Sequence, residues 1–357
     1  MRSSCPYHAQ PVTAKWRDCV AKVPVAEIDP TTAGSFQIER STVIASAGSC
    51  FAQNMRNHLI RHGYNYLITE PGAQELSATE REDRQYGIFP ARFGNVYTTT
   101  QLYQLLERAF GRFTPQEDYW QDADAYYDPF RPHVEPDGFA SIGALQDDRT
   151  RHLAATRRMF ETVEVFVFTL GLTEAWRSRI DGGVFPVCPG CSVGTFDPNR
   201  HEFVNFGVRE STDALFAFVE GFRAVNPNAK VILTVSPVPL LATMTPQHVI
   251  QATTYSKSVL RVAAEEARQH FPHVDYFPSF EIIMATNRTQ EFFAGDRRTV
   301  TKTGVERVMD LFFHRYAGEV LPDRSAATAD NPGRPAIIDK IVCDEEQALR
   351  ALQSLRG

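Results

Sequence analysis

The sequence predicts an α/β fold in which helices cover both faces of a mainly parallel central sheet. Two apolar runs, at 163–170 and 230–235, have the composition of strands that are buried on both faces. Segments with helical periodicity separate these and other strand candidates along the chain. Unusual polar residues follow several strand candidates, at the sheet edge where ligands bind in this class.

The first strand candidate, 43–47, runs directly into a helix predicted over 51–62. This helix has one apolar face, made of Phe51, Met55, Leu59 and Ile60. Gly63 follows, and glycine readily takes the left-handed conformation that ends many helices. A second short strand is predicted at 65–68.

The remaining elements follow from the same patterns. Thr98 or Thr99 is expected to cap a helix that ends near Ala109. The later elements, in chain order, are predicted as a helix at 148–161, a strand at 163–170, a helix at 211–224, a strand at 230–235, a helix at 246–270, a strand at 274–277 and a helix at 303–316.

One domain is expected at 41–320, because strands and helices alternate across it. Residues 1–40 are predicted to form an irregular lead-in, and 321–357 a Pro/Ala/Asp-rich tail with one short helix at 345–355. Aromatic residues mixed with Pro, Asp and Gly at 112–145 indicate an ordered insertion. It is either a lid over a binding site or an embellishment of the surface.

Composition and charge exclude several classes of function. The chain has 357 residues, and its net charge of −6 gives no global basic field that would attract nucleic acid. The first residues lack an apolar core of signal-peptide length, and no uncharged apolar stretch is long enough to span a bilayer. We therefore expect a cytoplasmic protein without membrane insertion and without a nucleic-acid partner. The sequence does not indicate an oligomeric state.

The six cysteines do not suggest a disulfide framework in a chain of this length. Cys188 and Cys191 form a C-x-x-C pair within 176–205, a Gly/Pro-rich stretch that is predicted to be a loop. A zinc site would need a second pair, and a redox site would place the pair at the start of a helix. The favoured interpretation is a loop with two thiols. Neither a metal nor an organic cofactor is expected.

Gly48-Ser49-Cys50 is the most informative motif, because it places two candidate nucleophiles at a strand-to-helix turn. The N–H groups at the start of a helix stabilise negative charge of the kind that develops during acyl transfer. In the plainer interpretation, Ser49 caps the helix and both side chains pack into the turn.

Several segments resemble the GSCFA-domain proteins, which belong to the SGNH, or GDSL-like, hydrolase superfamily. They are GSCFA at 48–52, ARFGNVYT at 91–98, FTLGLTEAW at 168–176, TFDPNRHEFVNF at 195–206, VILTVSPVPL at 231–240 and YSKSVLRVAAEE at 255–266. The resemblance spans roughly 40–317 and implies a three-layer α/β/α fold. It also implies cleavage or transfer of acyl groups on oxygen esters, often acetyl groups on carbohydrates.

The superfamily pattern implies particular site residues. Gly-Asp-Ser laid without gaps on Gly-Ser-Cys puts Cys50 at the nucleophile position, and a shift by one residue puts Ser49 there. The oxyanion glycine corresponds to Gly94, with Asn95 beside it as a further donor; a Gly-Asn turn without a catalytic role is the alternative. Thr173-Glu174 takes the place of an Asn-Asp pair, in which Thr173 can donate a hydrogen bond and Glu174 can orient another side chain.

The Asp-x-x-His pair of the superfamily corresponds to Asp296 and Thr299, so the general base is missing from its usual place. Three interpretations follow. Another histidine takes the role, with His201 the first choice and His133 the second. Alternatively, Cys50 acts as a preformed thiolate, or the site binds a ligand without converting it. Arg297 and Arg298 lie where they can meet an anionic substrate.

The sequence therefore favours an SGNH-like esterase or acyltransferase that acts on a small molecule or an O-acylated carbohydrate. Its nucleophile is at the Gly-Ser-Cys turn, and Asp296 orients a base or a polar network. The alternative function is a non-catalytic module that binds a sugar or acyl group on the same fold.

Overall fold

The computed structural model describes residues 5–284, 289–322 and 344. A four-stranded sheet lies at the centre of this part of the chain, in the order β1-β4-β8-β9. Its strands are β1 (Ile44–Ala47), β4 (Val165–Leu170), β8 (Lys230–Val235) and β9 (Val274–Tyr276). All neighbouring strands pair in parallel. The predicted α/β class and these four strands are confirmed.

Alternate residues of the sheet enter two separate cores, as the period of two in a strand requires. On β4, Val165 and Val167 pack into one core, whereas Phe166 and Phe168 pack into the other. Every residue of β4 is buried. The apolar run that predicts this strand thus reflects helices packed on both of its faces.

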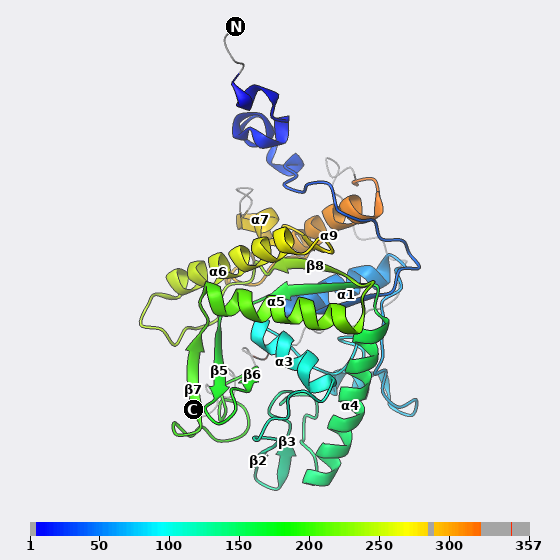
Figure 1. Ribbon diagram of the computed structural model, residues 1–357, viewed down its shortest axis with the longest axis vertical. Coiled ribbons are helices and arrows are strands. Elements are labelled where there is room, and N and C mark those ends of the chain that lie inside the picture. The colour runs from blue at the N-terminus through cyan, green and yellow to red at the C-terminus, as the bar shows by residue number, and fades with distance from the viewer. Residues whose placement is uncertain (1–4, 285–288, 323–343, 345–357) are drawn as a thin grey trace.

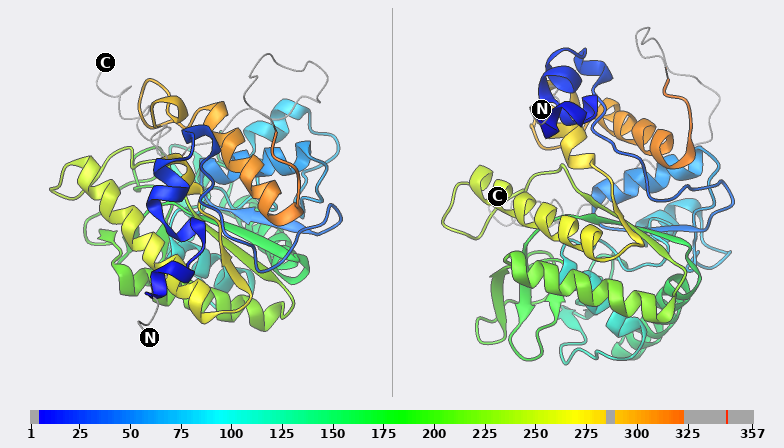
Figure 2. Two further views of the ribbon diagram at one scale, coloured as in Figure 1. Left: turned by 90° about the horizontal axis from the view of Figure 1, so that it is seen from above. Right: turned by 45° about the horizontal axis from the view of Figure 1, so that its top comes forward.

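Helices cover both faces, so the molecule has three layers (Figures 1 and 2). The first core is formed with α3 (Thr99–Ala109), α4 (Ile142–Thr162), α5 (Val208–Val225) and α6 (Val249–His270). The second core is formed with α1 (Cys50–Arg61), α7 (Ser279–Met284), α8 (Thr289–Phe292) and α9 (Lys302–Ala317). None of the described helices is long and apolar enough to cross a membrane.

Most of the predicted helix ends are confirmed, but the helix predicted from 148 begins earlier, at Ile142. Thr98 caps α3 in a capping box with Gln101. Gly63 follows α1 with a φ of +73°. One assignment to the buried face is wrong, because Ile60 is 37% exposed while Phe51, Met55 and Leu59 are buried.

The predicted loop at 176–205 is wrong. This region contains most of a three-stranded antiparallel sheet in the order β6-β5-β7, made of β5 (Glu174–Ser178), β6 (Val184–Phe185) and β7 (His201–Asn205). These strands are short and mostly only half-buried, and Gly/Pro-rich turns separate them. Their sequence therefore lacks the apolar runs that reveal the central strands.

Other elements also differ from the prediction. The segment 112–145 contains a hairpin of β2 (Trp120–Asp122) and β3 (Ala125–Tyr127). The strand expected at 65–68 is reduced to one bridge between Tyr66 and Ile44. A short helix, α2 (Ala78–Asp83), was not predicted, although Ser77 forms a capping box with Glu80.

The N-terminal segment contains short helical turns and projects from the body of the molecule (Figure 1). These turns are η1 (Pro6–Ala9), η2 (Val12–Ala14), η3 (Arg17–Ala21) and η4 (Val25–Glu27). The helix predicted at 345–355 lies outside the described residues.

Gly48 allows the chain to leave β1 and enter α1 at once. Its φ is +145°, a conformation that other residues rarely adopt. A Cβ at this position would lie 2.8 Å from both the Cβ and the carbonyl oxygen of Thr169 on β4. The turn therefore requires glycine for its backbone conformation and for its close approach to the sheet.

We expect Gly48→Ala to destabilise the protein by about 3 kcal/mol, because backbone strain and a clash with a central strand act together. Gly111→Ala is a matched control, since Gly111 has a φ of +69° and open space around its Cβ position. It should cost only about 1 kcal/mol. Urea unfolding of both variants tests this difference, and equal losses would contradict the packing role of Gly48.

Candidate active site

The Gly-Ser-Cys turn presents its two candidate nucleophiles differently. Ser49 is the N-cap residue of α1, yet its hydroxyl makes no capping hydrogen bond, and its side chain is buried. Cys50 is the first residue of the helix and is partly exposed. Cys50 is therefore the more accessible of the two groups.

A small cavity lies against this turn, at the carboxyl edge of the parallel sheet. Its lining combines the turn with residues that follow β4 and β8: Ser49, Cys50, Gly171, Leu172, Ser236, Val238 and Pro239. Tyr97, Lys257 and Arg298 complete the wall. The structure thus brings together the strand ends that the sequence indicates as a ligand site.

Two cationic side chains border this cavity. Lys257 lies on α6 and is almost fully buried, and its Nζ donates to the carbonyl oxygen of Gly171 at 2.6 Å. The Nε of Arg298 donates to the carbonyl oxygen of Pro239 at 3.2 Å. Both hydrogen bonds hold a positive charge next to a loop that follows a central strand.

The sequence indicates Arg298 as a candidate site residue but gives no such indication for Lys257. A lysine within an amphipathic helix is normally solvated, so its residue type gives no sign of burial. The only available signal is the position of Lys257 within the GSCFA-like segment at 255–266.

Asn95 is buried beside α1, and both ends of its amide are held. Its Oδ1 accepts a hydrogen bond from Nε2 of Gln53, about one turn after Cys50, at 3.1 Å. Its Nδ2 donates to Oδ2 of Asp344 at 2.9 Å. The N–H of Val96 also donates to the carbonyl oxygen of Gly48 at 2.8 Å. The proposed oxyanion segment and the nucleophile turn are therefore in direct contact.

The bend before Asn95 is made by Gly94, whose φ is +69°. A buried arginine, Arg92, anchors the same segment. Its guanidinium donates to Asp148 at 3.0 Å and to Glu135 at 2.8 Å. The Arg-Phe-Gly-Asn sequence thus combines an ionic anchor with the bend that places Asn95.

Asp344 connects Asn95 with His133. Oδ1 of Asp344 lies 2.7 Å from Nδ1 of His133, and Nε2 of His133 lies 2.9 Å from the hydroxyl of Ser192. The Tyr97 hydroxyl is 3.5 Å from Oδ2 of Asp344. The sequence gives no signal for the Asp344–His133 pair, because 211 positions separate the two residues.

His201, the first-choice base, is buried with both ring nitrogens in use. Its Nδ1 accepts from the N–H of Asp197 at 3.0 Å, so Nε2 carries the proton and donates to Glu117 at 2.9 Å. His201 therefore fastens β7 to the 112–145 segment. His133 is the histidine whose hydrogen bonds lead to Asn95.

Thr173 and Glu174 hold neighbouring segments together. The Thr173 hydroxyl donates to Asn205 at 2.7 Å, which joins the start of β5 to the end of β7. Glu174 accepts from the Thr243 hydroxyl at 2.6 Å and from the N–H of Met244 at 3.1 Å. Glu174 thus orients the 243–244 loop, whereas Thr173 is buried and bonded to Asn205.

Asp296 and Thr299 form a local pair at the surface. Oδ2 of Asp296 accepts from the Thr299 hydroxyl at 2.6 Å, and Oδ1 accepts from the N–H of Arg298 at 2.9 Å. The Thr299 hydrogen bond is the main cause of a lowered pKa of Asp296. Asp296 thereby shapes the loop that carries Arg298. Arg297 is exposed, with a φ of +56°.

Cys188 and Cys191 line a larger neighbouring pocket. A hydrogen bond from the Cys188 thiol lowers the pKa of Cys191 to about 7 and raises the pKa of Cys188. Among the described residues, no cluster of three or more His, Cys, Asp or Glu side chains could hold a metal ion.

The surroundings of Arg92 predict that protein stability depends on pH. The titrating group is His152, which contacts Glu70, a neighbour of Arg92. Glu70 accepts from the N–H of Arg92 at 2.8 Å and contacts Nδ1 of His152 at 2.9 Å. Burial lowers the pKa of His152 to about 4. An unfolded chain binds a proton at this histidine near pH 6.5, so the folded state binds fewer protons between pH 6.5 and 4.

We expect the titration of His152 to lower the free energy of unfolding by roughly 3 kcal/mol as the pH decreases from 6.5 to 4. The effects of other titrating groups add to this contribution. His152→Gln should remove this part of the pH dependence, whereas His8→Gln, at an exposed site, should leave it unchanged. Urea unfolding across this pH range measures both. An unchanged slope in a folded His152→Gln protein would contradict the assignment.

A family model described as the GSCFA family matches residues 43–312. No curated protein matches the sequence. Among solved structures, the chain is similar to a crystal structure of an acetyl esterase mutant with acetate ion, at 9% sequence identity and a TM-score of 0.34. That match covers 75% of this chain and 92% of the other.

Proposed function

Since this chain belongs to the GSCFA family, we propose that it is an acyl-ester hydrolase or acyltransferase whose nucleophile is Cys50. One observation carries this proposal. The ends of three parallel strands meet at a cavity that contains Cys50 at the start of a helix, beside Lys257 and Arg298. The substrate class is an O-acylated carbohydrate or a small O-acylated molecule.

The electrostatics of the cavity support a negatively charged intermediate. The N-terminus of α1 carries a partial positive charge, and the basic side chains of Lys257 and Arg298 line the cavity wall. Positive groups of this kind activate cysteine nucleophiles and stabilise oxyanions. This arrangement supports attack by a Cys50 thiolate that needs no histidine as base.

In the proposed reaction, the Cys50 sulfur attacks the carbonyl carbon of the ester, and the carbonyl electron pair moves onto oxygen. Collapse of this tetrahedral oxyanion breaks the ester C–O bond. The alcohol leaves with a proton from solvent, and a thioester remains on Cys50. Water or a second alcohol then attacks the thioester, releases the acyl group and restores the thiolate.

The proposed oxyanion donors are the N–H of Cys50, the N–H of Gly94 and the amide of Asn95. A carboxylate oxygen of Asp344 already accepts from Asn95 at 2.9 Å. For Asn95, this role requires its Nδ2 to exchange the Asp344 carboxylate for the oxyanion. Asp296 takes the role of a positioning residue, since it accepts from the backbone of Arg298.

A second function, a non-catalytic module that binds an acyl or sugar group, is favoured by one specific observation. Asp296 pairs with Thr299 rather than with a histidine, and both His201 and His133 use both of their ring nitrogens. In this alternative, the cationic cavity binds its ligand without a covalent step.

We expect incubation with a p-nitrophenyl ester to release p-nitrophenolate and to leave a transient acyl adduct on Cys50, detected by mass spectrometry of peptides. Cys50→Ala should abolish the adduct and turnover. Cys19→Ser, which changes a thiol of the N-terminal segment outside both cavities, should retain both. Ser49→Ala tests the other candidate and should retain the adduct.

An adduct that instead forms on Ser49 would move the nucleophile by one residue. Absence of an adduct at both positions in a folded protein would contradict the enzyme and favour the binding module. Equal labelling of the exposed Cys5 would show only general thiol reactivity and would also contradict the assignment.

Lys257→Met should lower kcat/KM by about 100-fold, because a positive charge at the developing oxyanion is lost. Lys22→Met removes an exposed lysine of the N-terminal segment and should change kcat/KM less than twofold. Circular dichroism confirms folding of both variants. An unchanged kcat/KM in Lys257→Met would exclude Lys257 from the reaction.

A further inference from the structure

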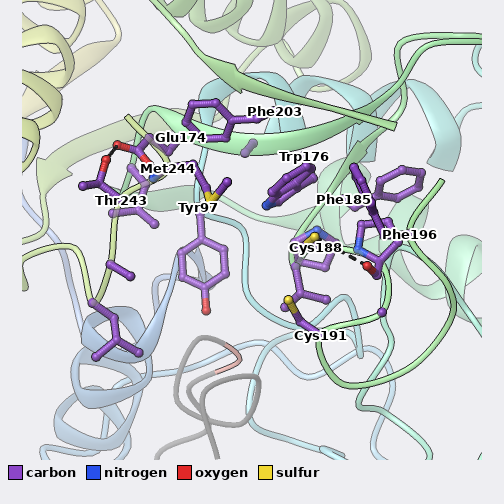
Figure 3. Close-up of a pocket in the computed structure, with 18 of the residues that line it drawn as sticks. Tyr97, Glu174, Trp176, Phe185, Cys188, Cys191, Phe196, Phe203, Thr243 and Met244 are labelled. Atoms are coloured by element: carbon purple, nitrogen blue, oxygen red, sulfur yellow. Dashed lines mark hydrogen bonds between the residues drawn. The ribbon is translucent and has the colours of Figure 1, made fainter. Parts of the chain in front are cut away.

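A pocket of about 710 Å³ lies next to the Cys50 cavity, and the function proposed above does not use it. Its wall is mainly apolar and aromatic, with Leu172, Trp176, Phe185, Phe196, Phe203 and Met244 among the lining residues (Figure 3). This volume is typical of pockets that enclose a whole small ligand. The pocket therefore has room for much more than an acetyl group.

The pocket is adjacent to the candidate nucleophile. Tyr97 and Leu172 line both the pocket and the Cys50 cavity. The carbonyl oxygen of Tyr97 accepts from the N–H groups of Gly171 and Leu172, each at 3.0 Å, which fixes the shared wall. The two cavities thus share one wall, and the substituent of a carbonyl held at Cys50 would have to pass Tyr97 to enter the pocket.

Polar side chains of the pocket wall already form hydrogen bonds to other groups of the protein. Glu174 accepts from Thr243, and Oε1 of Gln101 accepts from the N–H groups of Tyr97 and Thr98. These groups are satisfied before a ligand arrives, so they do not select for a highly hydroxylated one. The remaining surface favours apolar groups that lose water on binding.

The pocket is also preformed. Trp176 packs edge-to-face on Phe196, with ring centroids 5.2 Å apart, and on Phe203, with centroids 5.9 Å apart. Glu174 holds the 243–244 loop at the opposite side. A rigid wall of this kind reduces the entropy that is lost when an apolar chain binds.

We propose that this pocket binds the acyl chain of the substrate, and that the chain is a medium-length apolar one rather than acetyl. This inference rests on the proposed function of Cys50. In this proposal, the aromatic wall formed by the sheet of β5, β6 and β7 selects the acyl chain. The alcohol part of the ester then leaves by the side of Arg298.

The direct test is a series of p-nitrophenyl esters from acetate to octanoate. We expect kcat/KM to rise by up to about fourfold for each added methylene until the pocket is filled. Phe196→Ala should reduce the octanoate-to-acetate ratio of kcat/KM by about tenfold. Tyr119→Ala removes an aromatic residue of similar exposure (40% against 42% for Phe196) outside the pocket, and it should leave the ratio unchanged.

A binding measurement separates failure of the pocket from failure of the catalytic proposal. Octanoate should quench the fluorescence of Trp176 in Cys50→Ala protein, whereas acetate should not. The Phe196→Ala change in the same protein should weaken octanoate binding about tenfold. The Trp176→Phe variant should lose the octanoate-dependent quenching, which shows that the fluorescence change comes from Trp176 and not from Trp16 or Trp120.

Each outcome decides the proposal. Turnover with a flat chain-length profile and no octanoate binding would overturn the pocket assignment and leave the catalytic proposal intact. Octanoate binding that depends on Phe196, without turnover of any ester, would support the pocket and contradict catalysis. Equal effects of Phe196→Ala and Tyr119→Ala on the ratio would also overturn the assignment.

Discussion

The close approach of Gly48 to Thr169 is the constraint on which the candidate site depends. It allows the chain to turn from β1 into α1 directly against the central strand β4. The carbonyl oxygen of Gly48 also accepts a hydrogen bond from the N–H of Val96. This bond fixes the segment that contains Asn95 to the turn. A larger residue at position 48 would separate Cys50 from the loops that follow β4 and β8. The geometry of the cavity therefore depends on glycine at position 48, because a side chain there would clash with β4.

Around this turn, charge and apolar surface are separated. Lys257 and Arg298 border the small cavity at Cys50, whereas Trp176 and Phe196 line the larger pocket beside it. Tyr97 belongs to both walls. This separation suits a reaction in which charge develops at a carbonyl while an apolar substituent stays out of water. It connects the proposed chemistry of Cys50 with the inferred choice of acyl chain.

The central fold was predictable because its physical causes are local in sequence. The apolar runs of β4 and β8 reflect burial on both faces, and Thr98 with Gln101 encodes a helix start. The β5–β7 sheet was not predictable in this way, because half-buried strands broken by Gly/Pro turns have no distinct periodicity.

The site was predictable at its backbone turns but not in its side-chain partners. Gly48 and Gly94 are visible as glycines at strand ends and bends. The burial of Lys257 and the pairing of Asp344 with His133 depend on the tertiary structure alone. His201 has the residue type of a base, yet its role is set by Glu117, which lies 84 positions away.

A crystal structure after reaction with a chloromethyl ketone that carries an eight-carbon chain would test the proposed site most directly. The prediction is a thioether bond to Sγ of Cys50, a ketone oxygen facing Gly94 and Asn95, and the chain lying between Tyr97 and Phe196. A bond to another cysteine, or a chain directed into solvent, would contradict it.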